Sequence, residues 1–243
     1  MDLIVEQGNT KLKIAVSDCG KIVSSTCLDR DEISAVRDVI EQYHPEQGII
    51  SSVADTNESL VVYLKERLKY LLRLEEHTPV PIRLEYETKE TLGKDRIAAA
   101  VGANYLQPER NLLVIDAGTA ITYEVIESSG VYKGGNISPG LTTRFRALNQ
   151  FTERLPLVQE KENVPLIGTS TESAILAGVV NGIVYEMDGC IDMLKAKYGN
   201  IFVFLTGGHS FYFERRLKNH IFADANLVLV GLNRILEYNA EKN

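Results

Sequence analysis

Short apolar runs alternate with amphipathic segments along the first half of the chain. Runs rich in β-branched residues predict strands at residues 3–5, 12–16, 22–27 and 48–53. Apolar side chains that recur at three- and four-residue spacing predict helices at residues 31–43, 57–72 and 95–105. Pro79 and Pro81 bracket an extended segment that leads to Tyr86. The first half is therefore expected to open with a three-stranded meander and to continue in α/β units.

The same order of elements begins again near residue 110. Apolar runs predict strands at residues 112–115, 121–126, 132–138 and 201–205. Helices are expected after residue 138, from about Thr171 onward and at residues 232–238. Two segments that each open with a meander indicate a duplicated α/β domain, with residues 1–108 in the N-terminal half and 109–243 in the C-terminal half. Because no low-complexity linker separates the halves, we expect them to pack around a cleft.

Composition narrows the class of protein. The chain has 243 residues, 44% of them hydrophobic, which suits one large domain or two smaller ones. The formal net charge of -7 argues against nucleic acid as the main partner, because binding to a phosphate backbone depends on clustered Lys and Arg. Cys19, Cys27 and Cys190 show no C-x-x-C spacing, so they predict free thiols in a reducing cytoplasm.

Neither a secretion signal nor a membrane span is expected. Residues 1–6 contain no basic side chain and only three consecutive apolar ones. The most apolar long stretch covers residues 174–198. Polar side chains interrupt this stretch at Asn181, Glu186, Asp188 and Asp192. Since a spanning helix needs about 20 predominantly apolar residues in a row, we expect a cytoplasmic protein.

Two strands end in the same kind of turn. The run at residues 3–5 is followed by Glu6, Gln7, Gly8, Asn9 and Thr10, and the run at 113–115 by Asp116, Ala117, Gly118 and Thr119. A hairpin turn explains the glycines and small polar residues, but it does not need an acid. Glycine lets backbone N–H groups approach phosphate oxygens, and the acids would hold cations. The repeated turn therefore favours a site for nucleotide phosphates, with a plain hairpin as the alternative.

Further residues suit the same ligand. Lys13 could supply a positive charge to a phosphate, although the alternation of Lys11 and Lys13 with apolar residues fits a solvated strand face equally well. Gly93 to Arg96 opens a helix, where Asp95 could accept a proton or could simply favour the helix start. Thr206 to Gly208 follows a strand directly, at the end where α/β sheets bind ligands, or forms an ordinary glycine turn.

In this order the motifs resemble those of the type III pantothenate kinases, in the superfamily of acetate and sugar kinases, Hsp70 and actin. The family's D-x-G-N-T-x-x-K opening is matched by Glu6 to Lys13, and its Y-x-x-P-x-x-x-G-x-D-R block by Tyr86 and by Gly93 to Arg96. Later matches are D-x-G-T-A at residues 116–120, G-G-x-I-x-P-G at 134–140, T-x-x-S/A-x-x-x-G at 171–178 and T-G-G at 206–208. The resemblance covers nearly the whole chain and implies a duplicated ribonuclease H-like (actin-like ATPase) fold.

The resemblance also implies an activity, the ATP-dependent phosphorylation of pantothenate to 4'-phosphopantothenate. ATP would be bound by Glu6, Gln7, Gly8, Asn9, Thr10, Lys11, Leu12, Lys13 and Thr119. Pantothenate would be contacted by Tyr86, Gly93, Lys94, Asp95, Arg96 and Thr171, with Asp95 as general base. Asp116 would hold K⁺ or NH₄⁺, Mg²⁺ would accompany ATP, and Glu6 would reach that Mg²⁺ through water. Family members are homodimers, with the helix from Thr171 as a plausible interface element.

Three residues depart from the family pattern: Glu6 replaces the usual Asp, Lys89 a common proline and Leu176 a frequent glutamine. A rival interpretation is therefore a regulatory relative that keeps the fold and nucleotide binding but not the transfer. A regulator has no evident need for a general base at a helix start, so the enzyme is favoured by the joint presence of Asp95, Arg96, Asp116 and Thr119. A two-metal nuclease that uses Glu6 and Asp116 is disfavoured by the acidic charge balance.

Overall fold

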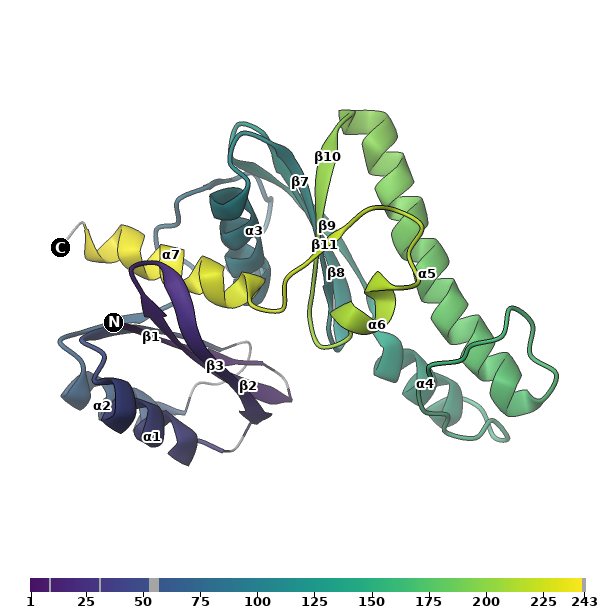
Figure 1. Ribbon diagram of the computed structural model, residues 1–243, viewed down its shortest axis with the longest axis horizontal. Helices are drawn as coiled ribbons and strands as arrows, with labels where there is room; N and C mark the ends of the chain where they lie inside the picture. The colour runs from purple at the N-terminus through teal and green to yellow at the C-terminus, as the bar shows by residue number, and fades with distance from the viewer. Residues whose placement is uncertain (9, 31, 53–56, 242–243) are drawn as a thin grey trace. The chain divides into compact units, whose positions relative to one another are not determined.

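A computed structural model describes residues 1–8, 10–30, 32–52 and 57–241 (Figure 1). Contacts divide the chain into two compact units. Unit 1 comprises Met1–Glu109, Ser129–Lys133 and Asn226–Asn243, and unit 2 comprises Arg110–Ser128 and Gly134–Ala225. The division into halves at residues 108 and 109 stays a prediction. Asn9, and the predicted start of a helix at Asp31 and end of a strand at Val53, lie outside the described residues.

Unit 1 contains a five-stranded mixed sheet in the order β3-β2-β1-β4-β5. Its strands are β1 (Asp2–Gln7), β2 (Lys11–Asp18), β3 (Lys21–Asp29), β4 (Gln47–Ser52) and β5 (Tyr70–Arg73). The first three pair antiparallel, which confirms the predicted meander, whereas β4 runs parallel to both β1 and β5. The central strands are buried on both faces, as their continuous apolar runs require.

Helices cover both faces of this sheet. They are α1 (Ser34–Tyr43), α2 (Glu58–Arg67), α3 (Lys94–Leu106) and α7 (Leu227–Ala240). Helices α1 and α2 share a hydrophobic core with the sheet, in which Leu3, Val36 and Leu64 are fully buried. Helix α7 contacts β1 and β4 and lies on the opposite side of the sheet (Figure 1). The C-terminal segment thus completes the core of the unit that the N-terminal segment begins.

Two glycines allow α3 and α7 to cross closely. A Cβ at Gly231 would lie 1.8 Å from the carbonyl oxygen of Ala98, and a Cβ at Gly102 would lie 2.3 Å from that of Leu227. Real Cβ atoms do not approach backbone oxygens so closely, so neither position accepts a side chain unless the helices separate. The alanine-rich sequence of α3 therefore serves backbone-to-backbone packing.

The helix predicted for residues 57–72 is shorter than expected. Asn57 caps α2 as predicted, because its side-chain oxygen accepts the Leu60 N–H at 3.2 Å. The helix ends at Arg67, where Leu68 turns to an extended conformation with φ -103° and ψ 142°. Residues 70–73 form β5, because pairing with β4 satisfies their backbone at the edge of the sheet. The apolar sequence of residues 70–73 is compatible with both a longer helix and a separate strand.

Unit 2 repeats the strand pattern of unit 1. The strands of its sheet are β7 (Asn111–Ala117), β8 (Ala120–Glu127), β9 (Val131–Pro139), β10 (Ile201–Thr206) and β11 (Phe222–Ala223), and β9 begins in unit 1 and continues in unit 2 from Gly134. The order β9-β8-β7-β10-β11 matches β3-β2-β1-β4-β5, with β7 antiparallel to β8 and parallel to β10. This correspondence confirms the predicted duplication. A further short strand, β6 (Arg83–Leu84), pairs in parallel with Val131 and Tyr132 at the start of β9, and these residues all belong to unit 1.

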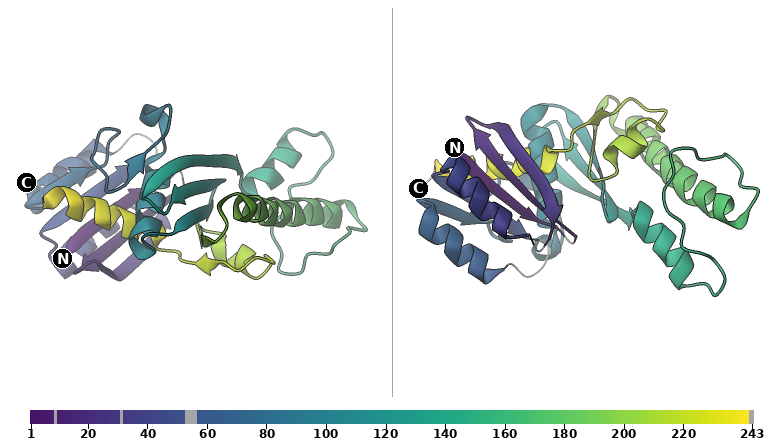
Figure 2. Two further views of the ribbon diagram at one scale, coloured as in Figure 1. Left: turned by 90° about the horizontal axis from the view of Figure 1, so that it is seen from above. Right: turned by 60° about the horizontal axis from the view of Figure 1, so that its bottom comes forward.

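Helices of unit 2 pack on one face of its sheet. They are α4 (Leu141–Gln150), α5 (Thr171–Tyr198) and the short α6 (Ser210–Glu214). Figure 2 shows α5 as one continuous helix. By length and composition α5 could cross a membrane, but half of its most apolar window is buried inside the structure, as in the core helix of a soluble protein. Its apolar residues Val180, Ile183 and Met187 are fully buried against the sheet.

Candidate functional site

The acids of the two repeated turns occupy equivalent places in the two sheets. Glu6 lies near the end of β1 opposite Ser51 of the parallel strand β4. Asp116 lies near the end of β7 opposite Thr206 of the parallel strand β10. Each acid therefore has a hydroxyl residue beside it at the carboxyl edge of its sheet, where α/β folds bind ligands. The two turns are thus alike not only in sequence but also in the residue that the parallel strand places beside each acid.

The antiparallel neighbours of the two acids differ. Opposite Glu6 lies Lys13, and opposite Asp116 lies Thr122. The Lys13 Nζ is 3.1 Å from the Glu6 Oε2, and the two side chains are 25% and 11% exposed. Lys11, by contrast, is exposed and pairs with Asp29 at 2.8 Å. Lys13 is thus held beside a buried acid, whereas Lys11 fits the solvated strand face.

The turn after β1 is a hairpin. The N–H of Gly8 donates to the carbonyl oxygen of Lys11 at 2.8 Å, so this amide does not point toward a ligand. Arg30 braces the turn from the end of β3, with its Nη1 donating to the Gly8 carbonyl oxygen at 2.7 Å. Arg30 was not expected from sequence, because only the pairing of β2 with β3 brings it to residue 8. The hairpin is therefore present, and a phosphate contact in this turn would have to come from groups other than the Gly8 N–H.

The other predicted residues of this segment have different surroundings. Thr10 is exposed, whereas Gln7 is only 3% exposed and its Oε1 has no hydrogen-bond partner in the described part of the chain. Leu12 is fully buried in the core under α1 and α2, so its side chain cannot touch a nucleotide. Any contact from Leu12 would come from its backbone.

The turn after β7 is held from two sides. The N–H of Gly118 donates to the Ala120 carbonyl oxygen at 3.1 Å, and the His209 N–H donates to that of Ala117 at 3.0 Å. Thr119 is exposed, and its carbonyl oxygen accepts the Gly140 N–H at 3.0 Å. The structure therefore gives this turn a fixed backbone and presents the Thr119 side chain to solvent.

The glycine after Thr206 lets two turns meet at Asp116. Gly207 has φ +92°, and a Cβ there would lie 2.4 Å from the Asp116 Oδ1. Nearby, the Thr206 Oγ1, the Ser210 Oγ and the His209 Nδ1 are buried without a partner among the described residues. Buried polar atoms normally find a partner, because leaving one unsatisfied costs free energy. These atoms thus indicate that water, an ion or a ligand completes the carboxyl edge of this sheet.

The start of α3 brings together the residues predicted to contact the second ligand. Gly93 forms the N-cap, and the Oδ1 of Asp95 accepts the Arg96 N–H at 2.9 Å. Arg96 is only 6% exposed, and its guanidinium lies 5.8 Å from the ring centre of Tyr86. Lys94 is half-buried beside them. Tyr86, Gly93, Asp95 and Arg96 thus form one cluster within unit 1.

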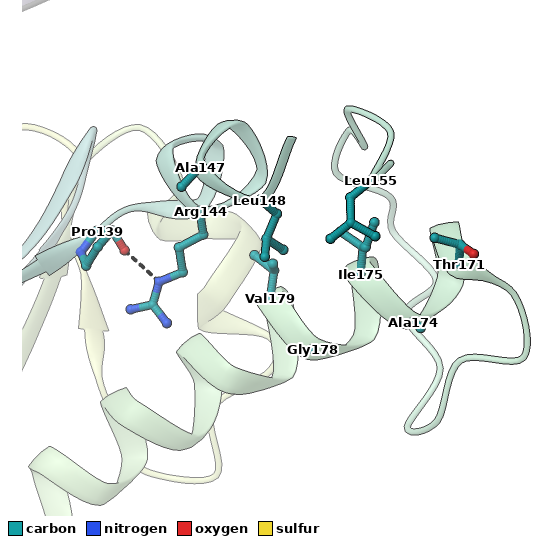
Figure 3. Close-up of a pocket in the computed structure, with 10 residues that line it drawn as sticks. All are labelled: Pro139, Arg144, Ala147, Leu148, Leu155, Thr171, Ala174, Ile175, Gly178 and Val179. Carbon is teal, nitrogen blue, oxygen red and sulfur yellow. Dashed lines mark hydrogen bonds between the residues drawn. The ribbon is translucent and has the colours of Figure 1, made fainter. Parts of the chain in front are cut away.

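Thr171 lies apart from the Asp116 turn, at the exposed first position of α5. It borders a cavity of about 740 Å³ between α4 and α5 (Figure 3). The walls are mostly apolar, with Leu148 facing Val179 and Leu155 facing Ile175, and Arg144 is the one charged residue among them. Neither Asp116 nor Thr119 lines this cavity.

Comparisons with known proteins agree with the geometry. The family model of the type III pantothenate kinases matches residues 2–193. The type III pantothenate kinase of Phocaeicola vulgatus is 47% identical and covers 98% of this chain and 99% of its own. That of Bacteroides fragilis is 48% identical and covers 98% of each chain.

A solved structure shows the same fold. A Baf family protein of Campylobacter jejuni, described as a transcriptional activator, has a TM-score of 0.60 and is 23% identical over 98% of this chain and 99% of its own. At that identity the likeness concerns the fold alone. Together with the repeated strand order, it confirms the predicted duplicated ribonuclease H-like fold.

Proposed function

This chain belongs to the type III pantothenate kinase family, and on that premise we propose how its residues serve the transfer of phosphate from ATP to pantothenate. Pantothenate and ATP are its small-molecule substrates, and 4'-phosphopantothenate, the first intermediate of coenzyme A biosynthesis, is its product. The observation that carries this conclusion is the match of the family model over residues 2–193. No observation favours a regulatory relative without transfer activity.

Asp95 is the proposed general base. It takes the proton from the 4'-hydroxyl of pantothenate as that oxygen bonds to the γ-phosphorus and the bond from this phosphorus to ADP breaks. The hydrogen bond from the Arg96 N–H to Oδ1 fixes the carboxylate and leaves Oδ2 to accept the proton. Tyr86, Gly93, Lys94 and Arg96 would orient pantothenate around it, with the Arg96 guanidinium kept in place over the Tyr86 ring.

ATP is assigned to residues 6–13 and to Thr119. The Lys13 ammonium, aligned by Glu6 at 3.1 Å, would attract the phosphates as a point charge. A divalent metal ion generally accompanies ATP in kinases, and we propose that this ion is Mg²⁺, which would neutralise charge on the phosphates when bound. Glu6 would contact the metal's water rather than the metal, because its carboxylate is already paired with Lys13. A longer acid in place of the usual Asp suits such an indirect role.

Asp116 is the proposed residue for a monovalent cation, K⁺ or NH₄⁺. Its strand neighbours Thr122 and Thr206 carry neutral hydroxyl oxygens and no positive charge, so a cation meets only oxygen donors from these three side chains. The unpartnered Oγ1 of Thr206 supports this assignment. When bound, the cation would supply positive charge close to a site that receives an anionic nucleotide.

A homodimer is proposed as the working form, with Thr171 contacting pantothenate. The outward side of α5 supports an interface, because Tyr185 and Met193 are 61% and 75% exposed, and a Cβ added at Gly182 or Gly189 would meet no other part of the described chain within 4 Å. The three cysteines are free thiols, which fits a cytoplasmic location. Light scattering after size exclusion should give a mass near twice that of the chain.

An assay of ADP release tests the proposed function. Release should depend on pantothenate, should need Mg²⁺, and should be faster in potassium than in sodium buffer. Release of ADP that does not change when pantothenate is omitted would contradict the assignment. Equal rates in the two buffers would contradict the monovalent-cation role of Asp116.

A further inference from the structure

A carboxylate in the middle of α5 gathers donors from three other elements. The Oε1 of Glu186 accepts the hydroxyl of Tyr123 from β8 at 2.7 Å and that of Ser138 from β9 at 2.5 Å. Its Oε2 accepts the Nη2 of Arg144 from α4 at 2.5 Å. The Glu186 and Arg144 side chains are 33% and 22% exposed, so water screens the pair only in part. None of these residues is needed to explain the family activity.

Glu186 and Tyr123 each keep one protonation state over a wide range of pH. Burial raises the pKa of Glu186, but the hydrogen bonds from Ser138, Arg144 and Tyr123 outweigh burial and hold this pKa below its ordinary value. Burial, together with the bond to Glu186, raises the pKa of Tyr123. Glu186 is therefore an anion and Tyr123 a neutral donor at any pH where the enzyme would work.

Arg144 connects this carboxylate to the corner between β9 and α4. Its Nε donates to the carbonyl oxygen of Pro139 at 2.8 Å (Figure 3), while its Nη2 donates to Glu186. Ser138, the residue before Pro139, is bonded directly to Glu186. One carboxylate thus fixes both the last residues of β9 and the first turn of α4.

The same corner holds the turn that carries Thr119. The Thr119 carbonyl oxygen accepts both the Gly140 N–H at 3.0 Å and the Thr143 Oγ1 at 2.7 Å. The approach is close, because a Cβ at Gly140 would lie 2.2 Å from the carbonyl oxygen of Gly118. A shift of the corner would therefore move Gly118 and Thr119 with it.

We propose that Glu186 is a positioning residue for nucleotide binding, which holds the Thr119 turn in place through Arg144, Ser138 and the corner they anchor. This inference rests on the proposed role of Thr119 as an ATP contact. A partly buried ion pair adds little net stability, because the cost of removing both charges from water offsets their attraction. The main effect of the network is fixed geometry, and a displacement of about 1 Å at a catalytic centre can cost roughly a hundredfold in rate.

The test compares two changes of carboxylate to amide on the same helix. Glu186→Gln keeps the size of the side chain but removes its negative charge and replaces one carboxylate oxygen with an NH2 donor, so it can no longer accept from Tyr123, Ser138 and Arg144 together. Asp188→Asn is the matched control, because Asp188 is 6% exposed and accepts the N–H groups of Lys218 and Asn219, in the loop between α6 and β11. Both variants should lower the melting temperature, so stability alone does not separate them.

The affinity for nucleotide and the steady-state kinetic constants distinguish the two variants. For Glu186→Gln we expect the Kd of a non-hydrolysable ATP analogue and the KM for ATP to rise about tenfold, with the KM for pantothenate changed much less. Asp188→Asn should keep both nucleotide constants close to those of the parent. The inference is overturned if the two variants change nucleotide binding equally, or if Glu186→Gln binds the analogue as tightly as the parent.

A second variant tests geometry without loss of charge. Arg144→Lys keeps a cation beside Glu186, but it lacks the planar guanidinium whose Nε and Nη2 bond to the Pro139 carbonyl oxygen and to the carboxylate. This variant should therefore also bind the ATP analogue more weakly than the parent. Unchanged affinity in Arg144→Lys would overturn the inference even if Glu186→Gln does not fold. A parent protein that binds the analogue but does not phosphorylate pantothenate would refute the proposed function alone, and one that binds no analogue would refute both.

Discussion

Replacing Glu6 with glutamine tests the role of the acid in the first turn. The Glu6 Oε2 lies 3.1 Å from the Lys13 Nζ. Two unit charges at this distance attract by about 5 kcal/mol at an effective dielectric constant of about 20, and desolvation offsets most of this energy. Glu6→Gln should therefore lower the free energy of unfolding by about 1–3 kcal/mol, the usual cost of leaving a buried polar group without its partner. Urea denaturation measures this loss.

The same substitution should affect turnover more than stability. Without the carboxylate Lys13 loses its alignment and the metal's water loses an acceptor, so we expect kcat to fall by about a hundredfold. Glu6→Asp keeps the charge and should retain or raise turnover. Glu46→Gln is the control, because it breaks the exposed Glu46–Lys69 ion pair in the same unit and should leave kinetics unchanged. If Glu6→Gln matches the parent at saturating Mg²⁺ and both substrates, the acid has no catalytic role and the turn is only a hairpin.

Other substitutions probe the remaining assignments. Asp95→Asn should lower kcat by about a hundredfold or more while calorimetry shows unchanged ATP affinity, and normal turnover would remove Asp95 from the mechanism. Asp116→Asn should abolish the difference between rates in potassium and sodium buffers, and a persisting difference would place the cation elsewhere. Gly231→Val would put a Cβ 1.8 Å from the Ala98 carbonyl oxygen and should cost about 3 kcal/mol or more, and an unchanged melting temperature would contradict the close helix crossing. Because folding lowers the Glu186 pKa from its ordinary value of 4.5, its contribution to stability is complete above about pH 4.5 and lost as pH falls through the folded value, so Glu186→Gln should show a shallower acid-induced loss than the parent.

The sequence predicted those elements whose formation depends mainly on neighbouring residues in the chain. Runs rich in β-branched residues predicted β1 to β3, and the Asn57 cap predicted the start of α2. The end of α2 at Arg67 was missed, because the run that follows gains its backbone partners from β4 rather than from its own turn. Strand β5 is therefore a product of tertiary pairing, which the run alone could not reveal.

In the candidate site too, residues in short local motifs could be predicted, whereas residues brought together by tertiary contacts could not. The acid and glycine turns at Glu6 and Asp116 were visible because both lie in short contiguous motifs. Arg30 could not be found, because the pairing of strands brings it to Gly8 from 22 residues away. Glu186 was visible only as an acid that interrupts an apolar stretch, and its partners come from three separate elements. The sequence alone did not distinguish Glu186 from Asp188 and Asp192, which interrupt the same apolar stretch.

The account is tested most directly by identifying the phosphorylated product. The purified protein is incubated with ATP, Mg²⁺, K⁺ and pantothenate, and the products are followed by ³¹P NMR and mass spectrometry, with Asp95→Asn in parallel. The account predicts a phosphate monoester on the 4'-hydroxyl of pantothenate, formed in equal amount to ADP and nearly absent with Asp95→Asn. Formation of inorganic phosphate with ADP, while pantothenate stays unmodified, would contradict it.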